Sequence, residues 1–161
     1  MYTLKELRKL CGLSQEETGD YINKTRQTYD NMEKGKTPLY NLQLEKLACL
    51  FGVDVSEIDT RSLKVINITK PYKLSDLRKA GVVKAFDIVF LCDCDTTTES
   101  FSQKLYNLEN GRALIYTNEL KQILRNTGVS VSDIDISTLW LVEYLGNGKI
   151  GKTLNKPSCN E

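Results

Sequence analysis

Apolar residues at helical spacing dominate the stretch 1–59 and predict a run of short helices. Residues 3–22 divide into two of these helices, separated by a tight turn at Gly12. Each opens with a capping box, formed by Thr3 and Glu6 in the first and by Ser14 and Glu17 in the second. Thr25 is placed to cap a third helix that ends at Gly35. The pattern therefore predicts helix, tight turn, helix.

Two more helices are expected within the same stretch. One has inward-facing apolar residues at Leu44, Leu47 and Phe51 and ends at Gly52. The segment DVSE then forms another capping box, from Asp54 to Glu57, which opens a last short helix. The stretch 1–59 is thus long enough for five helices around one small core.

The helical pattern occurs twice. Residues 27–59 and 103–135 align without a gap at an offset of 76 and share 12 identities in 33 pairs, against roughly two expected from composition. The shared positions include Gln27/Gln103, Asn31/Asn107, Glu33/Glu109, Gly35/Gly111, Tyr40/Tyr116 and Leu44/Leu120. We infer that the chain contains one folding unit in two copies.

The second copy is longer than the first in one place. Its beginning matches at an offset of 70, through Leu74, Leu77 and Arg78, so six residues have been inserted before Gln103. We expect the insertion on the second helix and the turn, where VVKAFDIVFLCDCDTTTES replaces a compact connection. Thr97 or Thr98 is the expected cap of the following helix, FSQKLYNLE.

Each helical segment is followed by a stretch typical of β-strands. These stretches are SLKVINIT at 62–69 and STLWLVEYL at 137–145. Asn147-Gly148 is a strong hairpin turn signal, so residues 138–154 are expected to form a β-hairpin. We expect SLKVINIT to join that hairpin in one sheet.

Charge and hydropathy narrow the class of protein. No run of 18 uncharged apolar residues occurs, and the N-terminus is too charged for a signal peptide, so we expect a soluble, cytoplasmic protein without a membrane partner. The formal net charge is only +1, and residues 1–59 hold 8 Lys and Arg against 10 Asp and Glu. If this segment binds DNA, its positive charge must be segregated onto one face.

The residue types argue against catalysis and metal binding. The chain has no histidine, which removes the commonest general base and the usual companion of zinc ligands. The five cysteines, of which Cys92 and Cys94 are the close pair, are expected to be reduced thiols. We therefore expect no enzyme activity and no catalytic residue, metal or cofactor.

A phosphate-binding motif near the C-terminus is rejected. Residues 146–153 read GNGKIGKT and fit the P-loop pattern. That loop needs a following helix whose N-terminus faces the phosphate, but few residues remain and Pro157 lies among them. The lysines of this segment are better explained as contacts to DNA backbone or solvent.

Several residues of the first copy stand at a spacing shared by a known family. They are Arg8, Leu13-Ser14-Gln15-Glu16-Glu17, Thr25, Met32-Glu33, Gly35-Lys36 and Gly52-Val53. With them, residues 3–59 resemble the lambda-repressor/Cro-type (XRE-like) helix-turn-helix family, and the second copy resembles it in divergent form. Thr18 and Gly19 depart from the family's usual leucine and alanine. Because glycine inside a helix costs about 1 kcal/mol, we expect another helix to cross close to Gly19.

The resemblance implies a mainly α fold. We expect two tandem five-helix helix-turn-helix domains, each followed by a β-strand, with a C-terminal β-hairpin. The expected boundaries are 1–59 for the DNA-binding domain, 60–70 for a basic strand and linker, 71–136 for the divergent domain, and 137–161 for the hairpin and tail.

The resemblance also implies the residues that bind DNA. The N-terminal part of the third helix enters the major groove in this family, which assigns base contacts to Arg26, Gln27 and Asn31. Asp30 on the same helix would be repelled by phosphate unless it faces a cytosine or turns away. Phosphate contacts are expected from backbone amides after Gly35 and from the side chains of Gln15, Lys24, Lys34 and Lys36.

The second copy is less suited to DNA. Its corresponding residues, Ser102, Gln103, Asn107 and Arg112, are only possible DNA contacts, because Ser102 replaces Arg26 and the turn holds Asp93, Asp95 and Glu99. Two structural ion pairs are implied by the family, Arg8 with Glu33 and Arg78 with Glu109. By the same spacing Tyr29, Met32, Leu105 and Leu108 are expected to be core residues.

These observations favour a sequence-specific DNA-binding transcriptional regulator, a phage or bacterial repressor that reads a palindromic operator in double-stranded DNA as a homodimer. The two copies either form a pseudo-dimer on two half-sites or divide the work, with the second mediating self-association, and we prefer the division. The rival class is a phage-encoded interaction module that inhibits a host protein such as a CRISPR nuclease, with or without autorepressor activity. The acidic turn from Asp93 to Glu99 would then be its contact or a DNA mimic.

Overall fold

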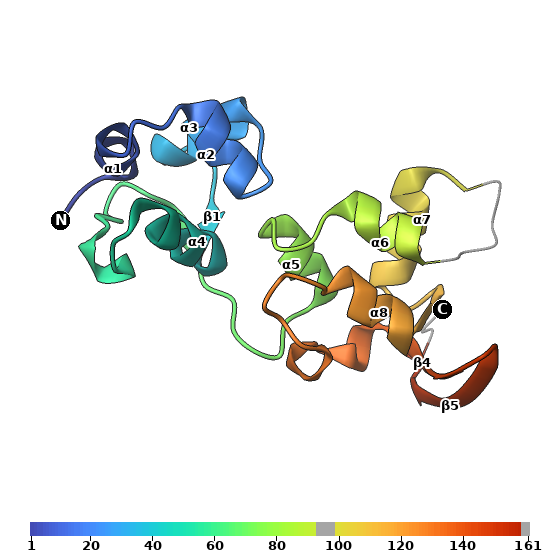
Figure 1. The fold of residues 1–161 in the computed structure, drawn as a ribbon. Helices are drawn as coiled ribbons and strands as arrows, with labels where there is room; N and C mark the ends of the chain where they lie inside the picture. The colour runs from blue at the N-terminus through green and yellow to red at the C-terminus, as the bar shows by residue number, and fades with distance from the viewer. Residues whose placement is uncertain (93–98, 159–161) are drawn as a thin grey trace. The chain divides into compact units, whose positions relative to one another are not determined.

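The computed structural model describes residues 1–92 and 99–158. These residues form eight α-helices and five short strands (Figure 1). They group into two units, one of Met1–Ile68 with Lys79–Val82 and one of Thr69–Arg78 with Val83–Glu161. No helix in the described part of the chain is long and apolar enough to cross a membrane.

The first unit begins with the predicted helix, turn and helix. Its elements are α1 (Leu4–Leu10), α2 (Gln15–Tyr21), α3 (Arg26–Glu33), β1 (Leu39–Tyr40), α4 (Asn41–Phe51), the 3-10 turn η1 (Val55–Glu57) and β2 (Val65–Ile66). The capping boxes of α1, α2 and η1 form as predicted, and the Thr25 side chain caps α3. The helix starts thus follow from interactions between close neighbours in the sequence.

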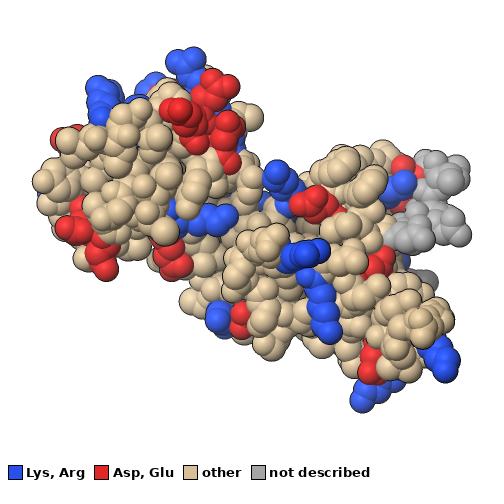
Figure 2. Space-filling model, in the orientation of Figure 1, with Lys and Arg blue, Asp and Glu red and all other residues tan. Residues whose placement is uncertain are grey.

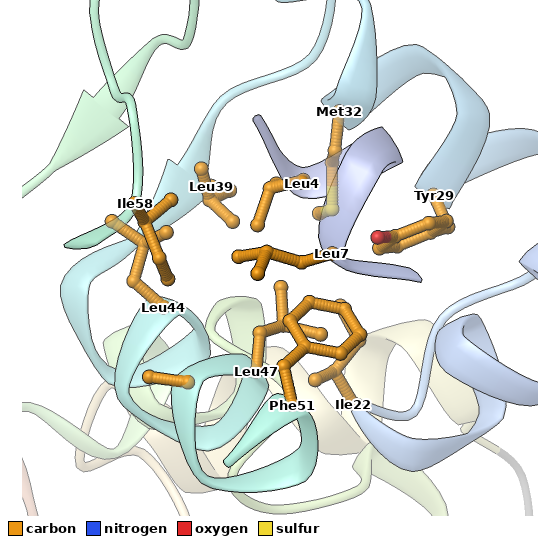
Figure 3. Packing of buried hydrophobic residues seen from close by; sticks show 11 residues of the cluster. Leu4, Leu7, Ile22, Tyr29, Met32, Leu39, Leu44, Leu47, Phe51 and Ile58 are labelled. Atoms are coloured by element: carbon orange, nitrogen blue, oxygen red, sulfur yellow. The ribbon is translucent and has the colours of Figure 1, made fainter. Parts of the chain in front are cut away.

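The core of the first unit lies between α1, α3 and α4 (Figure 3). Leu7 points from α1 toward Leu47 and Phe51 of α4, and Met32 of α3 closes the other side. Tyr29, Ile22 and Leu47 are completely buried. Each such side chain contributes about 1.5–3 kcal/mol when removed from water, so this cluster holds the helices in register.

The turn before α3 passes close to α2. A Cβ built on Gly19 would lie 2.8 Å from the carbonyl oxygen of Lys24. The prediction that another helix crosses close to Gly19 is therefore wrong in detail, because the segment next to Gly19 is the backbone of the turn at Lys24 and Thr25. Thr18, where the family usually has leucine, is fully buried, and its hydroxyl donates to the Ser14 carbonyl at 2.8 Å.

The second unit has a similar order of elements. It contains α5 (Leu74–Lys79), α6 (Ala85–Leu91), α7 (Phe101–Glu109), β3 (Leu114–Tyr116), α8 (Thr117–Ile123), the 3-10 turns η2 (Val131–Asp133) and η3 (Ile136–Thr138), β4 (Trp140–Gly146) and β5 (Lys149–Asn155). Because α2 and α6 keep the offset of 70 along their whole length, the six extra positions come after Leu91 in the sequence, in a segment of which residues 93–98 lie outside the described residues. Their predicted placement on the helix itself is wrong.

Helix α7 begins differently from the prediction. The Ser100 side chain, and not Thr97 or Thr98, caps it by accepting a hydrogen bond from the Gln103 amide at 3.2 Å. The two threonines lie outside the described residues. Leu108 is fully buried, whereas Leu105, also expected in the core, is only half-buried.

The strands form two separate sheets. The hairpin of β4 and β5 turns at Asn147 and Gly148 as predicted, with φ angles of 51° and 75°. However, β2 does not join it: Val65 pairs with Leu39 of β1, and Leu141 of β4 pairs with Ile115 of β3, both in parallel. The two pairings are equivalent in the repeat, so each strand joins the sheet of its own unit. The P-loop-like segment lies in the hairpin, with no helix after it in the described residues.

Two glycines test how closely the first unit is packed. Gly35 and Gly52 both have φ of +70°. A Cβ on Gly35 would collide with the Ser62 carbonyl oxygen, whereas a Cβ on Gly52 would point into open space, away from every described residue outside its own helix and its chain neighbours. We expect Gly52→Ala to cost about 1–2 kcal/mol for the left-handed backbone alone. Gly35→Ala should lower the free energy of unfolding further in urea titrations. Equal losses would mean that the Ser62 segment yields without cost.

Candidate nucleic-acid interface

Helix α3 separates an inner apolar face from an outer polar one. Tyr29 and Met32 are buried against the core, and burial raises the pKa of the Tyr29 hydroxyl well above its usual value. Arg26 and Gln27 are exposed near the start of the helix. Asn31 is half-buried one turn later, with its side-chain oxygen 3.4 Å from Gln27 Nε2. The residues predicted to contact bases therefore lie together on the part of α3 that faces away from the core.

A polar network fixes α3 to α1 and α2. Arg8 Nε of α1 lies 2.7 Å from Glu33 Oε1, and Arg8 Nη1 donates to the Leu13 carbonyl at 3.0 Å. The hydrogen bonds that the Arg8 guanidinium donates to the Glu33 carboxylate raise the pKa of Arg8. Gln15 Nε2 of α2 donates to Glu33 Oε2 at 3.1 Å and to Asp30 Oδ1 at 2.8 Å. Three helices are thus held at fixed positions around two carboxylates.

Asp30 is held by two neighbouring side chains. Its carboxylate accepts hydrogen bonds from Lys34 Nζ at 2.7 Å and from Gln15, and these bonds lower its pKa. The partly neutralised carboxylate then repels DNA less than an isolated one. Sequence reasoning did not anticipate this role for Asp30. The available signal was its spacing of four residues from Lys34.

The side chains predicted to contact phosphate differ in exposure and in their present hydrogen-bond partners. Lys36 is exposed, and Lys34 is exposed but paired with Asp30. Lys24 Nζ donates to the Lys79 carbonyl at 3.1 Å, and the Gln15 amide is engaged as described above. For Lys24 and Gln15, a phosphate contact through the side chain would require an exchange of partners.

The backbone amides after Gly35 are not available as predicted. The amides of Lys36 and Thr37 both donate to the Asn31 carbonyl, at 2.9 and 3.2 Å. These bonds close the C-terminal end of α3, where carbonyls otherwise lack partners. The prediction of phosphate binding by these amides is therefore corrected.

A shallow depression lies beside the outer face of α3. It is lined by Arg8, Ser14, Gln15, Glu16 and Arg26. In Figure 2, acidic and basic side chains lie next to one another over the part of the first unit that carries α2 and α3. The predicted segregation of positive charge onto one face is not visible in this view. Arg26 therefore lies at this depression among side chains of mixed charge, and not within a broad basic field.

The outer face of α7 in the second unit is arranged differently. Gln103 Nε2 donates to Asn107 Oδ1 at 3.0 Å, and Asn107 Nδ2 in turn donates to the Glu99 carboxylate at 3.2 Å. Arg112 lies over the Tyr106 ring, 5.4 Å from its centroid, and Ser102 is exposed. The Arg78–Glu109 ion pair spans 2.8 Å. The side-chain amides of Gln103 and Asn107 are therefore hydrogen-bonded in series to the Glu99 carboxylate. The negative charge of that carboxylate disfavours the approach of a phosphate group.

The described residues offer no obvious place for a metal. Among them, no three Cys, Asp or Glu side chains are grouped so as to hold an ion. Cys92 is buried, while Cys94 and the acidic positions Asp93 and Asp95 lie outside the described residues.

Comparison with known proteins identifies the first unit. Residues 4–58 match a family model described as helix-turn-helix, which covers about a third of the chain. No curated protein and no solved structure matches the chain. Residues 4–58 thus form a helix-turn-helix domain, the type of domain found in DNA-binding transcriptional regulators.

Proposed function

We propose that this protein is a sequence-specific transcriptional repressor whose helix α3 reads bases in the major groove. The observation that carries the proposal is the outer face of α3, where Arg26 and Gln27 are exposed while the Arg8–Glu33–Gln15 network fixes the helix behind them. A rigid helix with exposed arginine and amide groups suits the donor and acceptor pattern of base edges.

The two units divide the work in this proposal. Equivalent strand pairings, Leu39 with Val65 and Ile115 with Leu141, support a common origin for the units. In this proposal the first unit reads DNA. The second unit mediates self-association, because the side-chain amides of its α7 are hydrogen-bonded to the Glu99 carboxylate and are less suited to DNA. A homodimer would place two first units on a palindromic operator.

Selection from random and genomic DNA with the full chain, read by sequencing, tests the proposal. We expect enrichment of a palindromic consensus whose half-site spacing gives the number of reading units. Recovery of no sequence above background would exclude sequence-specific binding. A non-palindromic single site would retain DNA reading but exclude the symmetric dimer.

Single substitutions separate base contacts from phosphate contacts. Arg26→Ala and Gln27→Ala are expected to lower affinity for the selected site by roughly 1–3 kcal/mol each and to relax preference at one position. Lys36→Ala should weaken binding to all sequences about equally and reduce the salt slope by about one. Binding titrations on cognate and random duplexes at several salt concentrations measure both effects. Equal losses of affinity for both duplexes with Arg26→Ala would show that α3 is not the reading helix.

A further inference from the structure

The second unit carries two large aromatic side chains on the outside of α6. Phe86 and Phe90 are 60% and 73% exposed, and their rings stack with centroids 5.2 Å apart and planes at 13°. One turn separates them along the helix, while Ile88 on the opposite side is completely buried. Scattered exposed apolar residues are common, but adjoining aromatic rings are typical of interaction surfaces. We name this pair the aromatic face.

The aromatic face has a polar counterpart in the first unit. At the offset of 70, Phe86 corresponds to Glu16 and Phe90 to Asp20, and both carboxylates of α2 are exposed. The inner position is buried in both helices, as Thr18 in α2 and Ile88 in α6. On the outer side, α6 therefore exposes aromatic rings at the positions where α2 exposes carboxylates.

We propose that the aromatic face is the docking surface for a second copy of this chain, with the two α6 helices packed antiparallel about a two-fold axis. The inference rests in part on the proposed function, because it supplies the contact that a homodimeric repressor needs. In such an isologous contact, Phe86 of one copy meets Phe90 of the other, and the same contact forms twice. Offset or edge-to-face rings then replace water on both sides.

The charge at the ends of α6 favours a second copy of this chain as the partner of the aromatic face. Lys84 is the N-cap of α6 and its side chain makes no capping hydrogen bond. It therefore places a positive charge at the positive end of its own helix, which is unfavourable. In an antiparallel pair, Lys84 would lie by the C-terminal carbonyls of the other copy's α6, where a cation is favoured. With a net charge of +1, two copies also repel one another little.

The area of the aromatic face limits the expected affinity of the dimer. At the exposures of Phe86 and Phe90, the two rings present about 250 Å² per copy, so a two-fold contact buries about 500 Å² through them alone. A specific interface buries at least about 1,200 Å², which leaves more than half to the surroundings of the pair. We therefore expect a weak, reversible dimer that is strengthened when two half-sites on DNA bring the copies together.

Sedimentation velocity of the full chain from about 1 to 200 μM tests the proposal. The wild type should shift from monomer to dimer, and Phe86→Glu with Phe90→Asp, which installs the α2 residues, should weaken dimerisation at least about 10-fold. Ile150→Glu on the hairpin, 57% exposed in the same unit, is the matched control and should dimerise like the wild type. Circular dichroism melts establish that each variant is folded.

Lys84→Glu provides a second test of the dimer contact in which both aromatic rings remain. It should favour the isolated α6 helix through its dipole but weaken the dimer at low salt. A wild type that stays monomeric throughout, a double variant that dimerises normally, or a control that loses dimerisation equally would overturn the proposal. If the double variant does not fold, unchanged dimerisation of Lys84→Glu overturns it.

The DNA selection separates this inference from the proposed function. A chain that dimerises through the aromatic face but selects no sequence retains the inference and loses the function. A chain that selects an operator while the double variant binds it as tightly as the wild type retains the function and loses the inference.

Discussion

Replacing Arg26, Gln27 and Asn31 together by alanine is expected to lower the affinity for the selected operator at least about 100-fold, toward the level of random DNA. Each residue can distinguish a base by about 1–3 kcal/mol, and the three lie on one outward part of α3. The fold should survive, because Arg26 and Gln27 are exposed and the buried residues Tyr29 and Met32 are untouched. Binding titrations with the operator and a scrambled duplex measure the loss.

The second unit supplies the matched control for this experiment. Ser102, Gln103 and Asn107 stand at the same positions of α7, and their triple alanine variant should change operator affinity less than about 3-fold. The reason is that Asn107 is bonded to the Glu99 carboxylate and no arginine corresponds to Arg26. A similar loss in both triple variants would mean that both units read DNA, and the proposed division of labour would be wrong.

Glu33→Ala is expected to destabilise the first unit by about 3 kcal/mol. The side chains of Arg8 and Glu33 are only 10% and 5% exposed, so removing Glu33 leaves the guanidinium nearly buried without its carboxylate. Gln15 also loses one of its two acceptors. Hydrogen exchange of the α1 and α3 amides in the full chain reports the free energy of opening of this unit.

Two variants test the cause of that loss. Glu109→Ala removes the corresponding partner of Arg78, which is 27% exposed and can reach water, so a smaller loss is expected in the second unit. Replacing Arg8 by methionine and Glu33 by leucine together should restore much of the stability of the first unit, because no buried charge remains. A double variant as unstable as Glu33→Ala would show that the lost packing, not the buried charge, is responsible.

The helix ends of the first unit were predictable because their causes are local. A Ser, Thr or Asp cap acts on an amide two or three residues away, so Thr3, Ser14 and Thr25 could be identified without knowledge of the fold. The same holds for the Asn147-Gly148 turn, where both residues adopt positive φ. The cap of α7 was missed because Ser100 lies at the end of an insertion, one residue before the position equivalent to Thr25.

Strand pairing was not predictable in the same way. The residues 62–69 and 137–145 have the composition of strands, but composition does not select a partner. Leu39 and Ile115 are the actual partners of the two stretches. A helix and one 3-10 turn separate the paired strands along the chain in the first unit, and a helix and two 3-10 turns separate them in the second. The pairing depends on how these intervening elements fold back, which is a property of the packed unit.

The sequence by itself determined the order of the helices, the inner and outer faces of α3, and the partners Arg8 and Glu33, since these follow from spacing along one helix or from a motif. Only the tertiary structure decided what the polar groups bind. It brought the Gln15 amide of α2 to Asp30 and Glu33 of α3, joined Lys24 to the Lys79 carbonyl, and left the Phe86 and Phe90 rings exposed. Hydrogen bonds and exposure depend on which segments meet in space, and residues distant in the sequence meet only after the chain has packed.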